Sequence, residues 1–129
     1  MLMIRQLVPG DEDTLEDFLL PRLETSMFLI SNMRESGLEY TGERYTGDYV
    51  AAFEGDDIVA VMAHFWNGIV ITQAPVHLDA LWRETLKVSE RPLKGIIGPY
   101  EQVHALKRTL PLEPVALQLD RREILYSLA

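Results

Sequence analysis

Residues 58–73, which read IVAVMAHFWNGIVITQ, contain the feature that most restricts the fold of this chain. Ile58–Trp66 is apolar at nearly every position, which is typical of a strand buried on both faces. Asn67–Gly68 follows, and this pair is a strong signal for a tight turn between antiparallel strands, because both turn positions favour a positive φ. Ile69–Gln73 then predicts a returning strand. Together with Tyr49–Phe53, these segments predict a three-stranded antiparallel meander.

Further helices and strands are expected on both sides of this meander. Before it, the sequence predicts a strand at Met3–Val8 and helices that begin near Asp13 and Ser26, the second ending at Gly37. After it, the sequence predicts a helix that follows Pro75, a strand at Leu93–Gly98, a helix that follows Pro99, and closing strands at Val115–Leu119 and Ile124–Leu128. This order, β-α-α-β-β-β-α-β-α-β(β), predicts an α+β (α/β) fold in which helices flank a mixed, mainly antiparallel sheet.

Length and composition limit the classes of protein to which the chain can belong. Its 129 residues are expected to form a single domain, residues 1–129. The absence of cysteine excludes disulfides and thiol catalysis, and His64, His77 and His104 are too scattered to suggest a metal site. A net charge of −8 disfavours nucleic acid as a partner. No apolar run approaches the roughly 20 residues that span a bilayer, so we expect no membrane partner. Because Met1–Arg5 does not resemble a signal peptide, we expect a cytoplasmic protein.

Three stretches of the sequence, together with the order of elements, resemble a known superfamily. The stretches are SMFLISNMRESGLEY, AAFEGDDIVAVMAHFWNGIVITQAP and LKGIIGPYEQVHAL. Over essentially its whole length the chain is similar to the GNAT (N-acetyltransferase) superfamily, and especially to the amino-terminal half of bacterial two-domain GNAT proteins. In that subgroup a second GNAT module follows and carries the acyl-CoA site. The resemblance implies a GNAT-like fold, a second GNAT-like domain or a homo-oligomer as partner, and acetyl-CoA as cofactor if the chain is active.

The resemblance also identifies the position where a cofactor would bind. GNAT enzymes hold the pyrophosphate of coenzyme A in a loop of the form Arg/Gln-X-X-Gly-X-Gly/Ala, at the N-terminus of the helix after the fourth strand. The cofactor-binding candidates at this position are Gln73, Ala74, Val76 and His77. Gln73 fits the first place, but Val76 and Leu78 replace the glycines, and Pro75 removes an N–H donor. The sequence therefore predicts a cofactor position that has lost its cofactor motif.

Two residues are candidates for catalysis. Many GNAT enzymes carry a tyrosine on the last helix that reprotonates the leaving thiolate. If Leu110–Leu112 matches the end of that helix in the family, Lys107 occupies the tyrosine position and Tyr100 lies two turns earlier. His64 could act as a general base on an amine. Its apolar strand face favours the alternative, a hydrogen-bonded core histidine.

Two classes of function remain open. The favoured one is the non-catalytic supporting half of an acetyl-CoA-dependent N-acetyltransferase. The alternative is an autonomous acetyl-CoA-dependent N-acetyltransferase of an amine substrate, with an unusual pyrophosphate loop. We also expect Ile124–Leu128 to form an open edge strand, through which a second module or a second copy would bury Leu125 and Tyr126.

Overall fold

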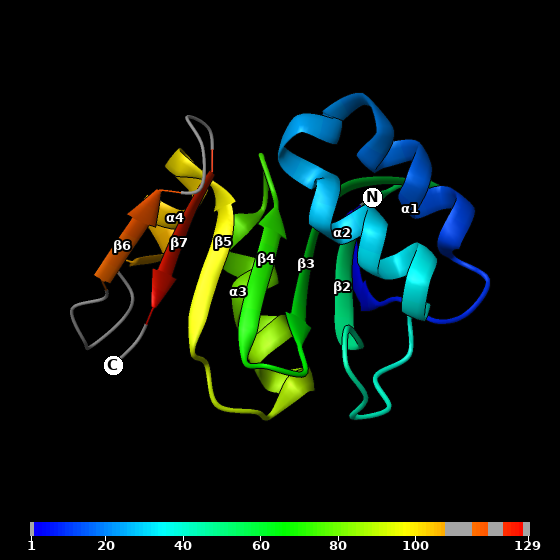
Figure 1. Ribbon diagram of the computed structural model, residues 1–129. Helices are drawn as coiled ribbons and strands as arrows, with labels where there is room; N and C mark the ends of the chain where they lie inside the picture. The colour runs from blue at the N-terminus through cyan, green and yellow to red at the C-terminus, as the bar shows by residue number, and fades with distance from the viewer. Residues whose placement is uncertain (1, 108–114, 119–122, 128–129) are drawn as a thin grey trace.

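The computed structural model describes residues 2–107, 115–118 and 123–127, which form a seven-stranded mixed sheet with helices on both faces (Figure 1). The strands are β1 Leu2–Gln6, β2 Gly47–Glu54, β3 Asp57–Phe65, β4 Ile69–Gln73, β5 Gly95–Pro99, β6 Val115–Gln118 and β7 Glu123–Ser127. The helices are α1 Glu12–Leu19, α2 Leu23–Ser36, α3 Leu78–Ser89 and α4 Tyr100–Lys107, with a 3-10 turn at Leu20–Arg22. The order of elements and the α+β class are confirmed.

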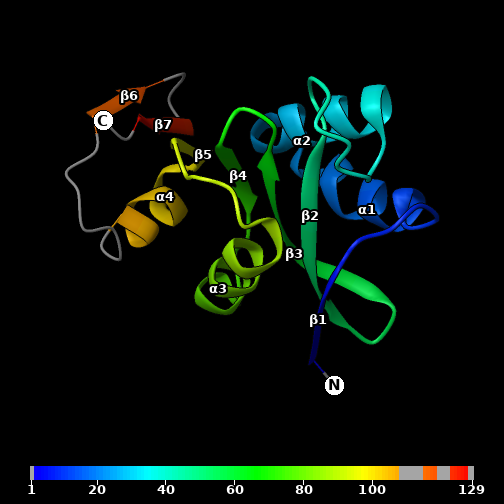
Figure 2. The ribbon, with the colours of Figure 1, turned by 90° about the horizontal axis from the view of Figure 1, so that it is seen from below.

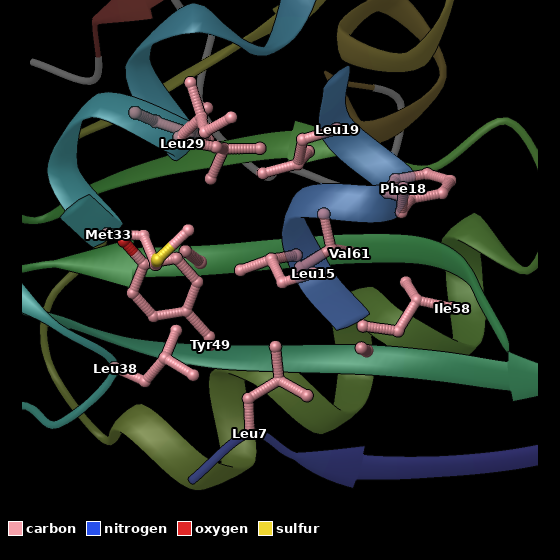
Figure 3. Close-up of a cluster of buried hydrophobic side chains, with 14 of the residues drawn as sticks. Leu7, Leu15, Phe18, Leu19, Leu29, Met33, Leu38, Tyr49, Ile58 and Val61 are labelled. Carbon is pink, nitrogen blue, oxygen red and sulfur yellow. The ribbon is translucent and has the colours of Figure 1, made fainter. Parts of the chain in front are cut away.

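The sheet separates two apolar cores. Helices α1 and α2 lie on one face, and α3 and α4 lie on the other (Figure 2). In the first core, Leu15 and Leu29 of the helices meet Tyr49 and Val61 of the sheet (Figure 3). Strand β3 supplies side chains to both cores because successive residues of a strand point to opposite faces. This confirms the prediction of a central strand buried on both faces.

Strands along the sheet follow the order β1-β2-β3-β4-β5-β7-β6. Strand β4 pairs with β5 in parallel, and the other described pairs are antiparallel. Strand β7 lies between β5 and β6, so the backbone at Leu125 and Tyr126 pairs within the chain on both sides. The expectation that Ile124–Leu128 forms an open edge was therefore wrong.

The turn between β3 and β4 lies at the predicted place but has a different backbone. Only Gly68 of the predicted pair has a positive φ, of 84°, and its N–H donates to the carbonyl of Phe65 over 3.0 Å. The loop is thus Trp66–Gly68, a three-residue connection that ends in a left-handed glycine. The expected requirement for a positive φ at Asn67 was wrong.

Helix α1 begins earlier than predicted, because Asp11 and not Asp13 is its N-cap residue. The carboxylate of Asp11 accepts hydrogen bonds from Arg5 over 2.8 and 3.0 Å and from the Val8 N–H over 2.9 Å. The hydrogen bonds from Arg5 hold the pKa of Asp11 below its usual value. Asp11 therefore ties the start of the helix to β1.

No helix in the described part of the chain is long and apolar enough to cross a membrane.

Two glycines with positive φ provide a matched test of the turn after β3. At Gly55, where φ is 65°, an added Cβ would meet no atom within 4 Å, so Gly55→Ala should cost only the backbone strain, about 1 kcal/mol. At Gly68 the added Cβ would lie 2.9 Å from the carbonyl oxygen of Pro92. We expect Gly68→Ala to lower the free energy of unfolding by at least about 1 kcal/mol more than Gly55→Ala, measured by urea denaturation. Equal losses of stability in the two variants would show that a Cβ atom at position 68 does not meet the carbonyl oxygen of Pro92.

Candidate functional site

The predicted cofactor position lies where β4 and β5 end and α3 begins. The two strands pair through Ile69–Ile71 and Gly95–Ile97. Beyond Ile71, β4 continues to Gln73 without a paired residue on β5. The resemblance to GNAT enzymes implies that a gap at this point would receive the extended arm of coenzyme A. The question is whether the chain leaves such a gap open.

Gly98 closes the gap from the side of β5. A Cβ atom at Gly98 would lie 2.5 Å from Cγ2 of Thr72 and 2.9 Å from its carbonyl oxygen. The φ of Gly98 is not in the positive range, so the glycine is required for space and not for conformation. The backbone of β5 therefore packs directly against Thr72, which is fully buried. No room remains between the strands at this level for a ligand.

Gln102 of α4 closes the position further. Its Oε1 accepts a hydrogen bond from the backbone N–H of Ala74 over 2.7 Å and lies 3.4 Å from Oγ1 of Thr72. The N–H of Ala74 is the first donor of the loop that follows β4, and it is already bonded within the chain. Sequence reasoning missed Gln102, because no local motif marks a glutamine in the first turns of a helix as the partner of a loop 28 residues earlier.

The other predicted cofactor residues do not form a phosphate cradle. Gln73 is nearly buried, whereas Pro75 and Val76 are exposed. His77 is the N-cap residue of α3, with a left-handed backbone (φ 57°) and no side-chain capping bond. In the first turn of the helix, Asp79 adds a negative charge where an anion would have to bind. The loop thus lacks both the glycines and the favourable field of an anion site.

A hollow of about 480 Å³ lies beside this loop, between it, α1 and the β2–β3 turn. Four carboxylates line this acidic hollow: Asp17, Glu54, Asp56 and Asp57. Arg22 also lines it, but its guanidinium lies 4.3 Å from the ring of Phe18 and donates to the Phe18 carbonyl. Repulsion between like charges therefore disfavours a pyrophosphate here. Among the described residues, no three histidines or carboxylates are placed to hold a metal ion.

The catalytic candidates do not converge on this position. His64 is fully buried on the face that packs against α3, and its Nδ1 lies 2.6 Å from Oγ of Ser89. Burial, and then the nearby charge of Arg91, lower the pKa of His64. Tyr100 is the first residue of α4, but its side chain and that of Lys107 are outside the described part of the structure, as is the predicted helix end at Leu110–Leu112.

On the opposite face, the paired residues of β4 and β5 themselves offer no proton-transfer group. Ile71 and Ile97, the paired residues of β4 and β5 on the α1/α2 side, belong to the apolar core or pack against it. Isoleucine can neither accept nor donate a proton. General acid–base chemistry at this point would therefore need groups from another element or another chain.

Several solved structures share this architecture. An acetyltransferase of the GNAT family from Staphylococcus aureus Mu50 superposes with a TM-score of 0.58 at 13% identity, covering 100% of both chains. A ribosomal-protein-alanine N-acetyltransferase from Brucella melitensis superposes with a TM-score of 0.55 at 13% identity, and the superposition covers 96% of both chains. A GNAT-family acetyltransferase from Streptococcus pneumoniae superposes with a TM-score of 0.52 at 11% identity, covering 98% of this chain and 96% of that one. No family model and no curated protein matches the sequence. The chain therefore has the GNAT fold.

The buried position of His64 predicts a specific pH dependence of stability. Because its pKa in the folded chain lies below the ordinary 6.5, the unfolded chain binds more protons just below pH 6.5. We expect the free energy of unfolding to fall as the pH is lowered from 7 to 5, by at most about 1.4 kcal/mol per pH unit. In the variant His64→Gln this dependence on pH should disappear. Urea denaturation at each pH measures it.

Asp11 provides the internal control for this experiment. Its pKa is lowered from an ordinary 3.8, so its contribution is present above that pH and lost only as the pH falls further, outside the window of His64. A wild-type curve that is flat from pH 7 to 5, or an unchanged slope in His64→Gln, would contradict the account of His64.

Proposed function

We propose that this chain is a non-catalytic GNAT-like module that supports the catalytic domain of an acetyl-CoA-dependent N-acetyltransferase. One observation carries the proposal. The position where the GNAT fold receives its cofactor is filled by atoms of the chain, through the packing of Gly98 on Thr72 and the bond from Ala74 to Gln102. A chain that satisfies these groups internally gains little by binding coenzyme A in their place.

The electrostatics of the neighbouring loop support the same proposal. The acidic hollow brings four carboxylates to the side of the loop, and Asp79 lies in the first turn of α3. A helix N-terminus attracts an anion through its N–H groups and dipole, but nearby carboxylates cancel that attraction. The loop also lacks the glycines that allow phosphates to approach the backbone.

The proposed partner is a second GNAT-like domain. The sequence resembles the amino-terminal half of two-domain GNAT proteins, in which the other module carries the acyl-CoA site. Such a domain would supply the cofactor site and the acid–base groups that Ile71 and Ile97 cannot provide. In this proposal acetyl-CoA binds to the second domain of the assembly and not to this chain.

Two observations favour the alternative, an autonomous N-acetyltransferase of an amine. The ladder between β4 and β5 ends after Ile71 and Ile97, so these two strands are not paired with each other beyond that point. The acidic hollow would also attract a cationic amine. This alternative requires Gln102 to release Ala74 and β5 to move away from Thr72 before the cofactor can enter.

Calorimetry with acetyl-CoA separates the two functions. We expect no measurable heat of binding to this chain and no acetyl-CoA-dependent change in its melting temperature. A ligand present at 100 times its Kd would stabilise the folded chain by about 2.7 kcal/mol, which is readily detected. A GNAT acetyltransferase with an intact glycine loop, measured in the same buffer, is the positive control. Low-micromolar binding with thermal stabilisation, or release of thiol from acetyl-CoA in the presence of amines, would establish the alternative.

A further inference from the structure

A second hollow lies on the α1/α2 face of the sheet, and uncharged side chains line it. In Figure 2, α1 and α2 lie over β2, β3 and part of β4, whereas no described helix lies over β5 on this face. The hollow lies beside α2 and has a volume of about 150 Å³. Its lining includes three isoleucines of β4 and β5 and four aromatic rings, those of Phe28, Tyr45, Phe65 and Trp66. It is called the aromatic hollow below.

The register of β4 and β5 explains why the sheet leaves space at this place. Ile69 of β4 pairs with Gly95 of β5, and Ile71 pairs with Ile97. The three isoleucines belong to the apolar core on the α1/α2 face or pack against it. Because residues two apart in a strand share a face, Gly95 lies on the same face as Ile97 but carries no side chain. The space beside Ile69 is therefore not filled from β5.

Aromatic rings form the deep part and the rim of the hollow. Phe65 is 1% exposed, whereas Phe28 and Tyr45 are 46% and 41% exposed. The ring of Trp66 meets that of Tyr45 edge to face with centroids 5.0 Å apart, and it meets that of Phe65 in the same way at 6.5 Å. Tyr45 has a positive φ of 69°, a costly conformation for a non-glycine residue that is over-represented at binding sites. Ring packing thus holds these walls in place, as in a preformed small-molecule site.

The volume and chemistry of the hollow determine what it can bind. A cavity of about 150 Å³ in an engineered protein accepts one benzene ring. None of the lining residues is charged, although 25% of the chain is Asp, Glu, Lys or Arg. A charged ligand would lose its hydration here without gaining a counter-charge. The amides of Asn32 and Asn67 are uncharged hydrogen-bonding groups, and the Asn67 Oδ1 accepts from the Ile69 N–H over 3.2 Å. The lining therefore suits a neutral ring that carries one polar group.

We propose that the aromatic hollow binds a small neutral aromatic molecule, with its ring against Trp66 and Ile71 and one hydroxyl or similar group at Asn32. An apolar cavity with a few uncharged polar groups is the usual form of a small-molecule site. The inference does not rest on the proposed non-catalytic function. The hollow lies toward the starts of β4 and β5, whereas the loop at the cofactor position follows the end of β4.

NMR of the isoleucine methyl groups, titrated with benzyl alcohol, tests the proposal. We expect saturable shifts at Ile69, Ile71 and Ile97, with a Kd of about 1 mM or below, as a ligand of this size gives. Ile58 does not line the hollow, and its methyl signals should stay unchanged. Benzoate and benzylammonium, charged molecules of similar shape, should bind at least about tenfold more weakly. The net charge of −8 would attract benzylammonium to the surface, so its weak binding distinguishes the uncharged hollow from general charge attraction.

Variants at the rim locate the binding. Asn32→Phe places a ring in the hollow and should abolish the saturable shifts. Ser31→Phe is the matched control, because Ser31 is an exposed neighbour that does not line the hollow, and it should leave the Kd unchanged. If Asn32→Phe lowers the melting temperature, Phe28→Ala replaces it and should raise the Kd several-fold. Met27→Ala is then the control, since Met27 is 56% exposed and does not line the hollow.

Three results would overturn the proposal. The first is the absence of saturable shifts at Ile69, Ile71 and Ile97 with benzyl alcohol at about 10 mM, well above the expected Kd. The second is binding of benzoate or benzylammonium as tight as that of benzyl alcohol. The third is a Kd that stays unchanged in folded Asn32→Phe and in Phe28→Ala.

Discussion

The parallel ladder between β4 and β5 is the constraint on which the rest of the structure depends. It joins the antiparallel strands β1–β4 to the closing strands β7 and β6, and the remaining described pairs are antiparallel. Parallel neighbours need a long crossover, which is why α3 crosses the α3/α4 face and buries Leu81 and Trp82 there. Where the ladder ends, Gly98 packs on Thr72 and Gln102 binds Ala74. The contacts that complete the sheet therefore lie at the position where we propose that the chain leaves no room for a cofactor.

The polar groups that could serve chemistry are used in packing. Arg91 donates to Asp48 over 2.7 Å and to the carbonyl of His64, and it lies 3.7 Å from the ring of Tyr40. This arrangement connects β2, β3 and the segment that follows α3, while His64 is bonded to Ser89. His64 is fully buried, and this burial, together with the charge of Arg91, lowers its pKa. The charges beside the loop after β4 are mainly the carboxylates of the acidic hollow, and their sign is wrong for a pyrophosphate.

The helices and strands were predicted well from the sequence, whereas the contacts that fill the space after β4 were not. Alternation and turn residues located β3 and β4 within a residue, because burial on both faces and the glycine at Gly68 have local causes. The departure of residues 73–78 from the GNAT loop pattern was also visible in the sequence, because it depends on residue types at fixed spacing. Three features could not be read from the sequence, because each joins segments distant in sequence: the hydrogen bond from the Ala74 N–H to Gln102, the packing of Gly98 on Thr72, and the place of β7 inside the sheet. Asp11 was missed as the cap of α1 because its partner, Arg5, lies on another element.

Amide hydrogen exchange at Ala74, followed by NMR, tests the central claim that the chain fills its own cofactor position. The account predicts that the N–H of Ala74 is protected in the wild-type chain, that acetyl-CoA leaves its exchange rate unchanged, and that Gln102→Ala removes the protection while the amide of Val61 stays protected in the sheet. Rapid exchange at Ala74 in the wild type, or a rate that changes on addition of acetyl-CoA, would contradict it.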